Sequence, residues 1–409
     1  MSTKKAAPNT PKNTFKVRSR WLPLVSILLV VIIYLSFFGQ SQYQWQLPDD
    51  MVPPVVPKSN PISQAKVDLG RHLFYDKRLS ANDSVSCATC HLQEKAFTDG
   101  EAQSTGLFGD KTPRNSMNLT NIAYNQNFTW ANPLMTELEH QARLPLFGET
   151  PAEMGLAGVE QAALEKLKAD HTYQPLFEAA FADQRPKEES LKELAQEQQS
   201  PLFSMNNVIN AIASFERTLL SFNSPYDQYL AGQSDAIDDS AKRGMKLFFS
   251  ERTECFHCHG SFNFSDSSLH QNTTEIAERF HNNGLYNVDG NGAYPKSDRG
   301  LFDMTSHQDD MGKFKAPTLR NIAVTAPFMH DGSIATLEGV IEHYANGGTD
   351  KREGKNKGFG SVSPYKSQFV SGFTLNPQEK ADLLVFLHSL TDDTFLTDPQ
   401  FSDPWVKGD

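Results

Sequence analysis

The chain has 409 residues, of which 38% are hydrophobic and 21% are charged, so it is long enough for two or three domains with ordinary buried cores. Its formal net charge of −11 at pH 7 argues against nucleic acid as a partner and favours a partner with a basic contact surface. All four cysteines fall within two short motifs, which leaves none for a separate disulfide framework.

The N-terminal segment combines a basic stretch with an apolar run. Residues 1–20 are rich in Lys and Arg, whereas 21–38 are uncharged and just long enough to span a bilayer. This charge pattern predicts a cytoplasmic basic segment and an exported C-terminal part. Residues 21–39 are therefore predicted to be a transmembrane anchor. A signal peptide is the alternative, although no clear A-x-A cleavage site follows the apolar run.

A Gln- and Pro-rich linker at 40–61 precedes a chain that is predicted to be mostly helical with long loops. From Ser63 onward apolar residues recur at helical spacing, and strand-like alternation is scarce. Further helices are predicted at 160–169, 175–182, 208–220, 240–249, 336–344 and 377–390.

The motif Cys-x-x-Cys-His occurs at 87–91 and again at 255–259. This motif attaches c-type haem: the thiols bond to the haem vinyls and the histidine becomes the proximal iron ligand. A thiol-redox pair needs no trailing histidine, and a zinc site would bring its two Cys pairs much closer in sequence. The sequence therefore predicts two covalent haem c groups, held by Cys87, Cys90 and His91 and by Cys255, Cys258 and His259.

The two motifs divide the chain into related halves. The segment 69–74 before the first motif loosely matches 241–248 before the second. We expect a mainly α fold in which two cytochrome c-like haem domains pack about an inter-haem interface. The predicted parts are an N-terminal domain at 62–222, a joint at 223–239, a C-terminal domain at 240–391 and a tail at 392–409.

Longer segments around these motifs carry a family resemblance. The first motif lies within LGRHLFYDKRLSANDSVSCATCHLQEKAFTDG, and KAPTLRNIAVTAPFMHDGSIATLEGVIEHY follows near the C-terminus. Both resemble the bacterial di-haem cytochrome c peroxidase/MauG family, over about 62–391. A third segment, PRNSMNLTNIAYNQNFTWANPLMTELEHQARLPLFGETPAEMG, is most similar to the MbnH-like branch, whose members oxidise a tryptophan on a small copper-associated partner.

The resemblance implies a periplasmic enzyme that uses hydrogen peroxide at the N-terminal haem and passes electrons through the C-terminal one. In the family's peroxidases a removable histidine lies sixteen positions after the proximal one, where this chain has Leu107. Because leucine cannot ligate iron, the haem on His91 is predicted to stay five-coordinate and open. Met117 is the alternative ligand.

The resemblance also implies an acid–base pair for splitting peroxide. The family's Glu lies in a P-x-E-M segment after an upstream Gln, and these positions match Glu153 and Gln141. Glu149 competes with Glu153, because the spacing here is two residues longer than in the family. The alternative role for Glu153 is a solvated helix start behind Pro151.

Two aromatic residues match the family's redox positions. Trp130 resembles the tryptophan between the haems, although a core role is the alternative. Tyr344 stands fourteen positions after His330 of the HDG motif, where the peroxidases have methionine and the MauG-like members have tyrosine. It is predicted to be the sixth ligand of the second haem and to favour oxidised iron. His343 is the alternative ligand.

The family places a calcium ion between the haems, and the matching ligands are Asn115, Thr325 and Pro327. One departure concerns the partner. Where the methylamine-utilisation enzyme has a surface tryptophan before its second motif, this chain has Thr253, which puts an exit route for oxidising equivalents through that position in doubt.

Three functions compete. The first is a MauG- or MbnH-like enzyme that uses peroxide to oxidise a residue, most often tryptophan, on a periplasmic protein. The second is a cytochrome c peroxidase supplied with electrons by a small cytochrome or cupredoxin, and the third is an electron carrier. Leu107 and Tyr344 favour the first, and Glu153 with an open haem argues against the third.

Overall fold

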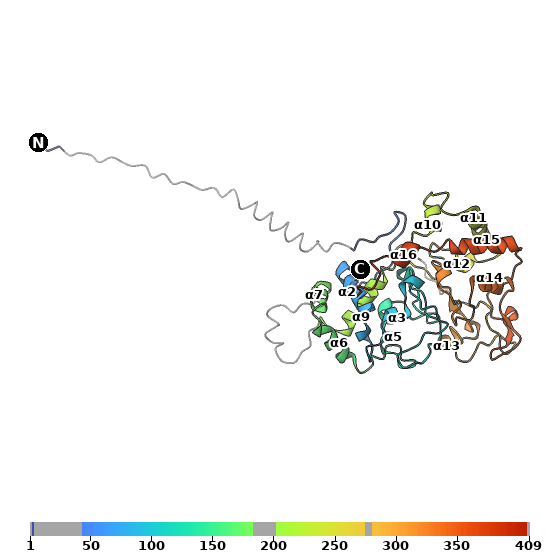
Figure 1. The fold of residues 1–409 in the computed structure, drawn as a ribbon, viewed down its shortest axis with the longest axis horizontal. Coiled ribbons are helices and arrows are strands. Elements are labelled where there is room, and N and C mark those ends of the chain that lie inside the picture. The colour runs from blue at the N-terminus through green and yellow to red at the C-terminus, as the bar shows by residue number, and fades with distance from the viewer. Residues whose placement is uncertain (1, 4–42, 183–201, 275–279, 407–409) are drawn as a thin grey trace. The chain divides into compact units, whose positions relative to one another are not determined.

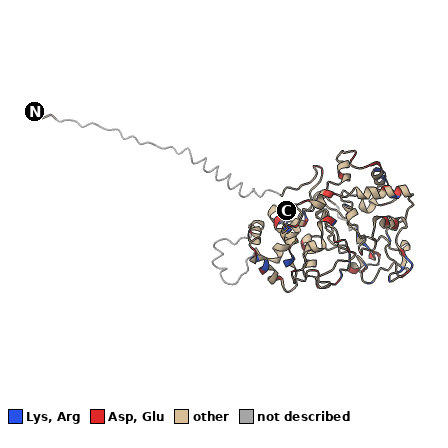
Figure 2. Cartoon of the chain, viewed as in Figure 1, with Lys and Arg blue, Asp and Glu red and all other residues tan. Residues whose placement is uncertain are grey.

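The computed structural model describes residues 2–3, 43–182, 202–274 and 280–406 (Figure 1). The predicted anchor or signal segment at 21–39 lies outside these residues. Within the described ranges, no helix is long and apolar enough to cross a membrane. Residues from Trp45 onward form one compact unit. Acidic and basic residues are both spread over this unit (Figure 2).

The described chain is mainly helical, as predicted. Its α-helices are α2 (Gln64–Phe74), α3 (Cys87–Cys90), α4 (Leu138–Gln141), α5 (Arg143–Phe147), α6 (Glu160–Ala169), α7 (Tyr173–Ala180), α9 (Met205–Glu216), α10 (Pro225–Leu230), α11 (Asp239–Phe248), α12 (Phe256–His259), α13 (Phe302–Thr305), α14 (Leu337–Ala345), α15 (Pro377–His388) and α16 (Asp393–Thr397).

Short 3-10 helices and two small sheets complete the fold. The 3-10 helices are η1 (Lys77–Leu79), η2 (Gln93–Lys95), η3 (Ile122–Tyr124), η5 (Gln308–Asp310), η6 (Ile322–Val324) and η7 (Gly360–Val362). Strand β1 (Phe280–His281) pairs antiparallel with β2 (Phe314–Lys315), and β3 (Asp350–Lys351) pairs antiparallel with β4 (Gly358–Phe359). The β1–β2 pair brings loops of the C-terminal half together beside the second haem motif.

The same helix crossing occurs once in each half. Helix α2 packs on α9, and α11 packs on α15. At each crossing a glycine faces a backbone carbonyl, because a Cβ on Gly70 would collide with the Ala211 oxygen and one on Gly244 with the Asp382 oxygen. Only glycine permits so close an approach. The two glycines lie in the segments that matched loosely in the sequence, so the match reflects an equivalent packing.

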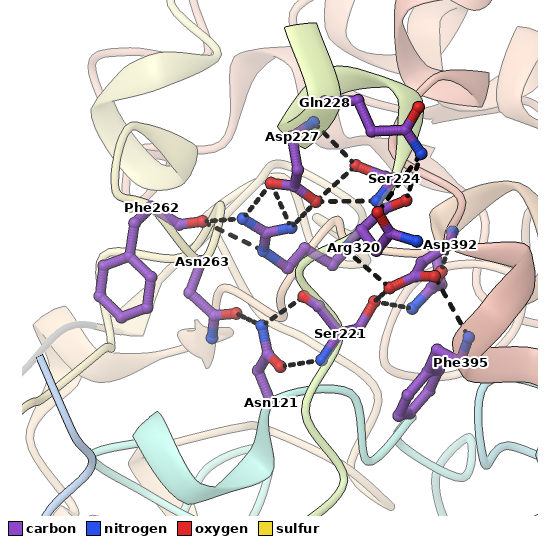
Figure 3. Close-up of polar contacts among 12 residues, drawn as sticks. Asn121, Ser221, Ser224, Asp227, Gln228, Phe262, Asn263, Arg320, Asp392 and Phe395 are labelled. Carbon is purple, nitrogen blue, oxygen red and sulfur yellow. Dashed lines mark hydrogen bonds and ion pairs between the residues drawn. The ribbon is translucent and has the colours of Figure 1, made fainter. Parts of the chain in front are cut away.

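A buried polar network holds the predicted joint in place (Figure 3). Arg320 pairs with Asp227 of α10 at 2.8 Å, with the arginine side chain only 3% exposed. The Asn121 amide oxygen accepts a hydrogen bond from the Ser221 backbone, and the Ser221 hydroxyl donates to Asp392. The network therefore ties the end of the N-terminal half to the C-terminal half and to the predicted tail.

The predicted tail is part of the folded unit. Residues 393–397 form α16, which packs against η2 of the N-terminal half. The Arg71 side chain donates to the Ser402 carbonyl at 2.7 Å, and the Tyr75 hydroxyl donates to the Phe401 carbonyl at 2.7 Å. The C-terminal residues thus fold back onto α2, beside the first haem motif.

Candidate active site

Each Cys-x-x-Cys-His motif lies at the wall of a large cavity. The first cavity is lined by Cys87, Cys90 and His91. The second is lined by Cys255, Cys258 and His259. All four thiols are unpaired, so neither motif forms a disulfide.

The two histidines have the geometry of iron ligands. Nδ1 of His91 contacts the Phe97 carbonyl at 2.6 Å, and Nδ1 of His259 contacts the Phe264 carbonyl at 2.8 Å. This contact fixes the tautomer and leaves Nε2 as the lone-pair nitrogen. Burial lowers the pKa of both imidazoles, which favours the neutral form that binds metal. Both cavities therefore fit a covalently attached haem.

Trp130 lines both haem cavities. Its indole Nε1 donates to the Asn115 carbonyl at 2.8 Å, and its own carbonyl accepts from the Lys315 backbone N–H at 2.8 Å. The ring is thus fixed from the N-terminal half through Asn115 and from strand β2 through Lys315. The structure therefore places this tryptophan in the wall of both cavities, and its redox role between the haems stays a prediction.

The structure separates the two candidate acid–base glutamates. Glu153 and Gln141 line the first cavity together, whereas Glu149 is exposed and does not line it. Burial raises the pKa of the Glu153 carboxyl, which suits a group that exchanges protons near neutral pH. No helix begins at Pro151, since the next helix starts at Glu160. The alternative role of Glu153 as a solvated helix start is therefore wrong.

Leu107 does not line the first cavity. Its backbone N–H donates to the Ala152 carbonyl at 2.8 Å, and its side chain lies against Gly155, so it supports the loop that carries Glu153. The alternative iron ligand, Met117, does line this cavity. The Met117 thioether is thus a candidate ligand in the wall of the first cavity. That the haem on His91 is five-coordinate stays a prediction.

Tyr344 lines the second cavity, whereas His343 does not. Both ring nitrogens of His343 already have partners, since Nδ1 contacts the Thr349 hydroxyl at 2.6 Å and Nε2 contacts the Asn283 carbonyl at 3.0 Å. The two residues are consecutive on α14, so their side chains point in different directions. Of the two candidates from the sequence, only Tyr344 reaches the second haem site.

A competitor that the sequence analysis missed also lines the second cavity. Met329, the residue before the HDG histidine, lies in its wall, and its sulfur accepts a hydrogen bond from the Asn283 amide at 3.2 Å. It is held with a backbone φ of +74°. A positive φ is unfavourable for a residue other than glycine, so the surrounding structure must hold Met329 in this conformation. No local pattern marked it as a possible ligand.

The three residues predicted to bind calcium converge on a third, smaller cavity, which is also lined by Trp130. The Asn115 amide nitrogen donates to the Glu101 carbonyl at 2.7 Å, which fixes the side-chain amide. The amide oxygen takes no part in that bond. Among the described residues, no hydrogen bond to the backbone oxygens of Thr325 or Pro327 is present. The oxygen donors suit calcium, whose binding here stays a prediction.

The first cavity contains a second carboxyl group that the sequence analysis did not identify. Glu216, at the end of α9, is buried, and its Oε2 has no hydrogen-bond partner within the described part of the chain. Burial raises its pKa to about 8, although neighbouring Arg217 lowers it. Glu216 is therefore mostly protonated at neutral pH and is a poor proton acceptor there.

The chain matches the family model of di-haem cytochrome c peroxidases over residues 64–235. It is 34% identical to the methylamine utilization protein MauG of Methylorubrum extorquens over 334 residues, 82% of this chain and 80% of that relative. The chain belongs to the di-haem cytochrome c peroxidase/MauG family. Membership implies two haem c groups and a haem oxidoreductase that uses peroxide.

Two further relatives represent the two sides of the family. The cytochrome c551 peroxidase of Pseudomonas aeruginosa is 28% identical over 375 residues, 91% of this chain and 92% of that protein. The crystal structure of a MauG-like protein associated with microbial copper homeostasis matches with a TM-score of 0.83 at 46% identity, over 89% of this chain and 100% of that one. The choice between the two activities therefore depends on the residues of the site.

Proposed function

We propose that this family member uses hydrogen peroxide to oxidise a residue, a tryptophan, on a periplasmic partner protein. The observation that carries the proposal is the tyrosine at the second haem site, because Tyr344 stands where the peroxidases have methionine and its side chain lines the cavity. The 46% identity to a MauG-like protein associated with copper homeostasis supports a small copper-associated protein as the partner.

In this proposal the residues of the first cavity handle protons. Glu153 accepts a proton from the attacking oxygen of peroxide and returns it to the leaving oxygen, while Gln141 orients the peroxide by hydrogen bonding. The Phe97 carbonyl contacts Nδ1 of His91 and so orients the imidazole for binding iron through Nε2. When bound, the haems supply the iron that reacts with peroxide and holds the oxidising equivalents. Trp130 relays electrons between the two sites.

Tyr344 sets the second site apart from that of a routine peroxidase. A phenolate favours oxidised iron, whereas a thioether favours reduced iron. Burial raises the pKa of the Tyr344 phenol, and a hydrogen bond with Asn283 opposes this shift. The phenol therefore needs a cation close by to give up its proton, and a ferric iron in the cavity would provide one.

Calcium and location complete the proposal. Asn115, Thr325 and Pro327 offer oxygen ligands in the cavity beside Trp130, where bound calcium would hold the two halves in register. Location in the periplasm follows from the need to attach haem c outside the cytoplasm and from the basic and apolar N-terminal segment. Inner-membrane anchoring through 21–39 is part of this proposal.

A cytochrome c peroxidase that takes electrons from a small cytochrome is the second candidate. One observation favours it: the Met329 thioether lines the second cavity together with Tyr344. If this sulfur were the sixth ligand, the second haem would resemble that of an electron-accepting peroxidase.

Two matched variants distinguish the candidates. Electron paramagnetic resonance of Tyr344→Phe should show loss of the wild-type low-spin signal of the second haem, and Met329→Leu should leave that signal unchanged. In parallel, turnover of peroxide with reduced cytochrome c should be slow in the wild type. The opposite spectral pattern, together with rapid turnover, would establish the peroxidase instead.

A further inference from the structure

Lys315 is a buried cation in the wall of the second haem cavity, beside Trp130. It lies on β2, is 3% exposed, and lines both the second haem cavity and the small cavity beside Trp130. Its ammonium group donates to the Asn127 carbonyl at 3.0 Å. Its backbone N–H donates to the Trp130 carbonyl, so the strand fixes the position of Lys315 relative to the tryptophan.

Other cations that line the haem cavities have a carboxylate partner. Arg114, in the first cavity, forms a bidentate ion pair with Asp298 at 2.7 and 2.9 Å. His281, in the second cavity, contacts Asp266 at 2.7 Å. Within the described ranges, no carboxylate lies within ion-pair distance of Lys315. Among these residues its ammonium group has a neutral carbonyl as hydrogen-bond acceptor and no counter-charge.

A buried ammonium without a counter-charge is costly, and such groups normally lose their proton or acquire an anionic partner. Burial does lower the pKa of Lys315, to about 7. The cavity that Lys315 lines is the one that fits a haem, and every haem c carries two propionate carboxylates. The missing anion can thus be supplied by the cofactor.

We propose that Lys315 binds a propionate of the haem attached at Cys255 and Cys258, and holds that carboxylate on the side of the cavity next to Trp130. Lys315 acts as a positioning residue for the cofactor. A propionate there would also reduce the repulsion between the ammonium and a cation bound in the adjoining small cavity. The inference rests on haem attachment and is independent of the partner substrate.

The ion pair has a consequence for the redox balance of the two sites. A positive charge paired with a propionate offsets the negative charge near the iron and makes the iron easier to reduce. Replacing Lys315 with a neutral residue of similar length should therefore lower the reduction potential of the second haem. The potential of the first haem should change much less, because Lys315 does not line its cavity.

The test compares three variants of the holoprotein by spectroelectrochemistry and resonance Raman spectroscopy. Lys315→Met should shift the potential of the second haem to more negative values and change its propionate vibrations, and Lys315→Arg should restore part of both. Lys313→Met is the matched control, because Lys313 carries the same charge two residues away, pairs with Asp310 at 3.0 Å and lines neither haem cavity.

An unchanged potential and unchanged propionate vibrations in Lys315→Met would overturn the proposal, as would an equal shift in the Lys313→Met control. If Lys315→Met fails to mature, the wild-type holoprotein decides by crystallography. A propionate oxygen within hydrogen-bond distance of Nζ supports the proposal, and a propionate turned away from Lys315 refutes it.

Discussion

The assignment of Glu153 as the acid–base group makes a quantitative prediction. Glu153→Gln keeps the size of the side chain and its place in the cavity wall but removes the ability to accept a proton. Removal of a positioned general acid–base group typically slows a reaction by about 10²–10⁴-fold. Glu149→Gln is the matched control, because Glu149 lies on the exposed side of the same loop and outside the cavity.

The structure supports the lower bound of this range. The other glutamate in the cavity, Glu216, has a pKa raised to about 8, so it is mostly protonated at pH 7 and is a poor substitute base. Gln141 cannot take up a proton under these conditions. The loss in Glu153→Gln should therefore be at least about 10²-fold at pH 7.

Stopped-flow mixing of the oxidised holoprotein with peroxide measures this loss through the Soret band. In the wild type the rate should rise with pH through the elevated pKa of Glu153, because the carboxylate is the active form, and Glu153→Gln should lose this dependence. A loss below about tenfold, or an equal loss in Glu149→Gln, would refute the assignment.

Three other predictions follow from the cavities. A pyridine haemochrome assay should find two haems per wild-type chain and one in Cys87→Ala or Cys255→Ala; one haem in the wild type would contradict both motifs. Because the pKa of Glu216 is raised on folding, its contribution to the free energy of unfolding is complete below the unfolded pKa of about 4.5 and is lost as the pH rises through about 8. The resulting decline in the free energy of unfolding of the wild type amounts to at most roughly 5 kcal/mol. Urea unfolding should show no such decline for Glu216→Gln, and the same decline in the variant would contradict the raised pKa. Elemental analysis should find one calcium per wild-type chain and none in Asn115→Ala, and calcium retained by the variant would place the ion elsewhere.

Features encoded locally were predictable. Helix α6 has the predicted bounds of 160–169, and α15 begins at the predicted Pro377, where Asn376 and Glu379 form a capping box. Helix α9 begins three residues before the predicted start, because Ser204 caps it. The β1–β2 pair was not predictable, since strands of two residues carry no alternation and depend on contacts across the fold.

The same distinction holds at the site. The Cys-x-x-Cys-His motifs are local, and the family resemblance led to Glu153, Gln141, Trp130 and Tyr344. No local pattern marked Glu216, Lys315 or Met329, because their importance comes from burial beside a cavity. A charged residue in a helix or strand normally faces water, and only the fold turns Glu216 and Lys315 inward.

Oxidation of a partner protein at a tryptophan by peroxide is tested most directly by mass spectrometry of a small copper-associated candidate partner, after incubation with the holoprotein and peroxide. We expect a mass change that maps to a tryptophan of the partner and is lost with Tyr344→Phe. An unmodified partner, together with rapid peroxide turnover by reduced cytochrome c, would contradict it.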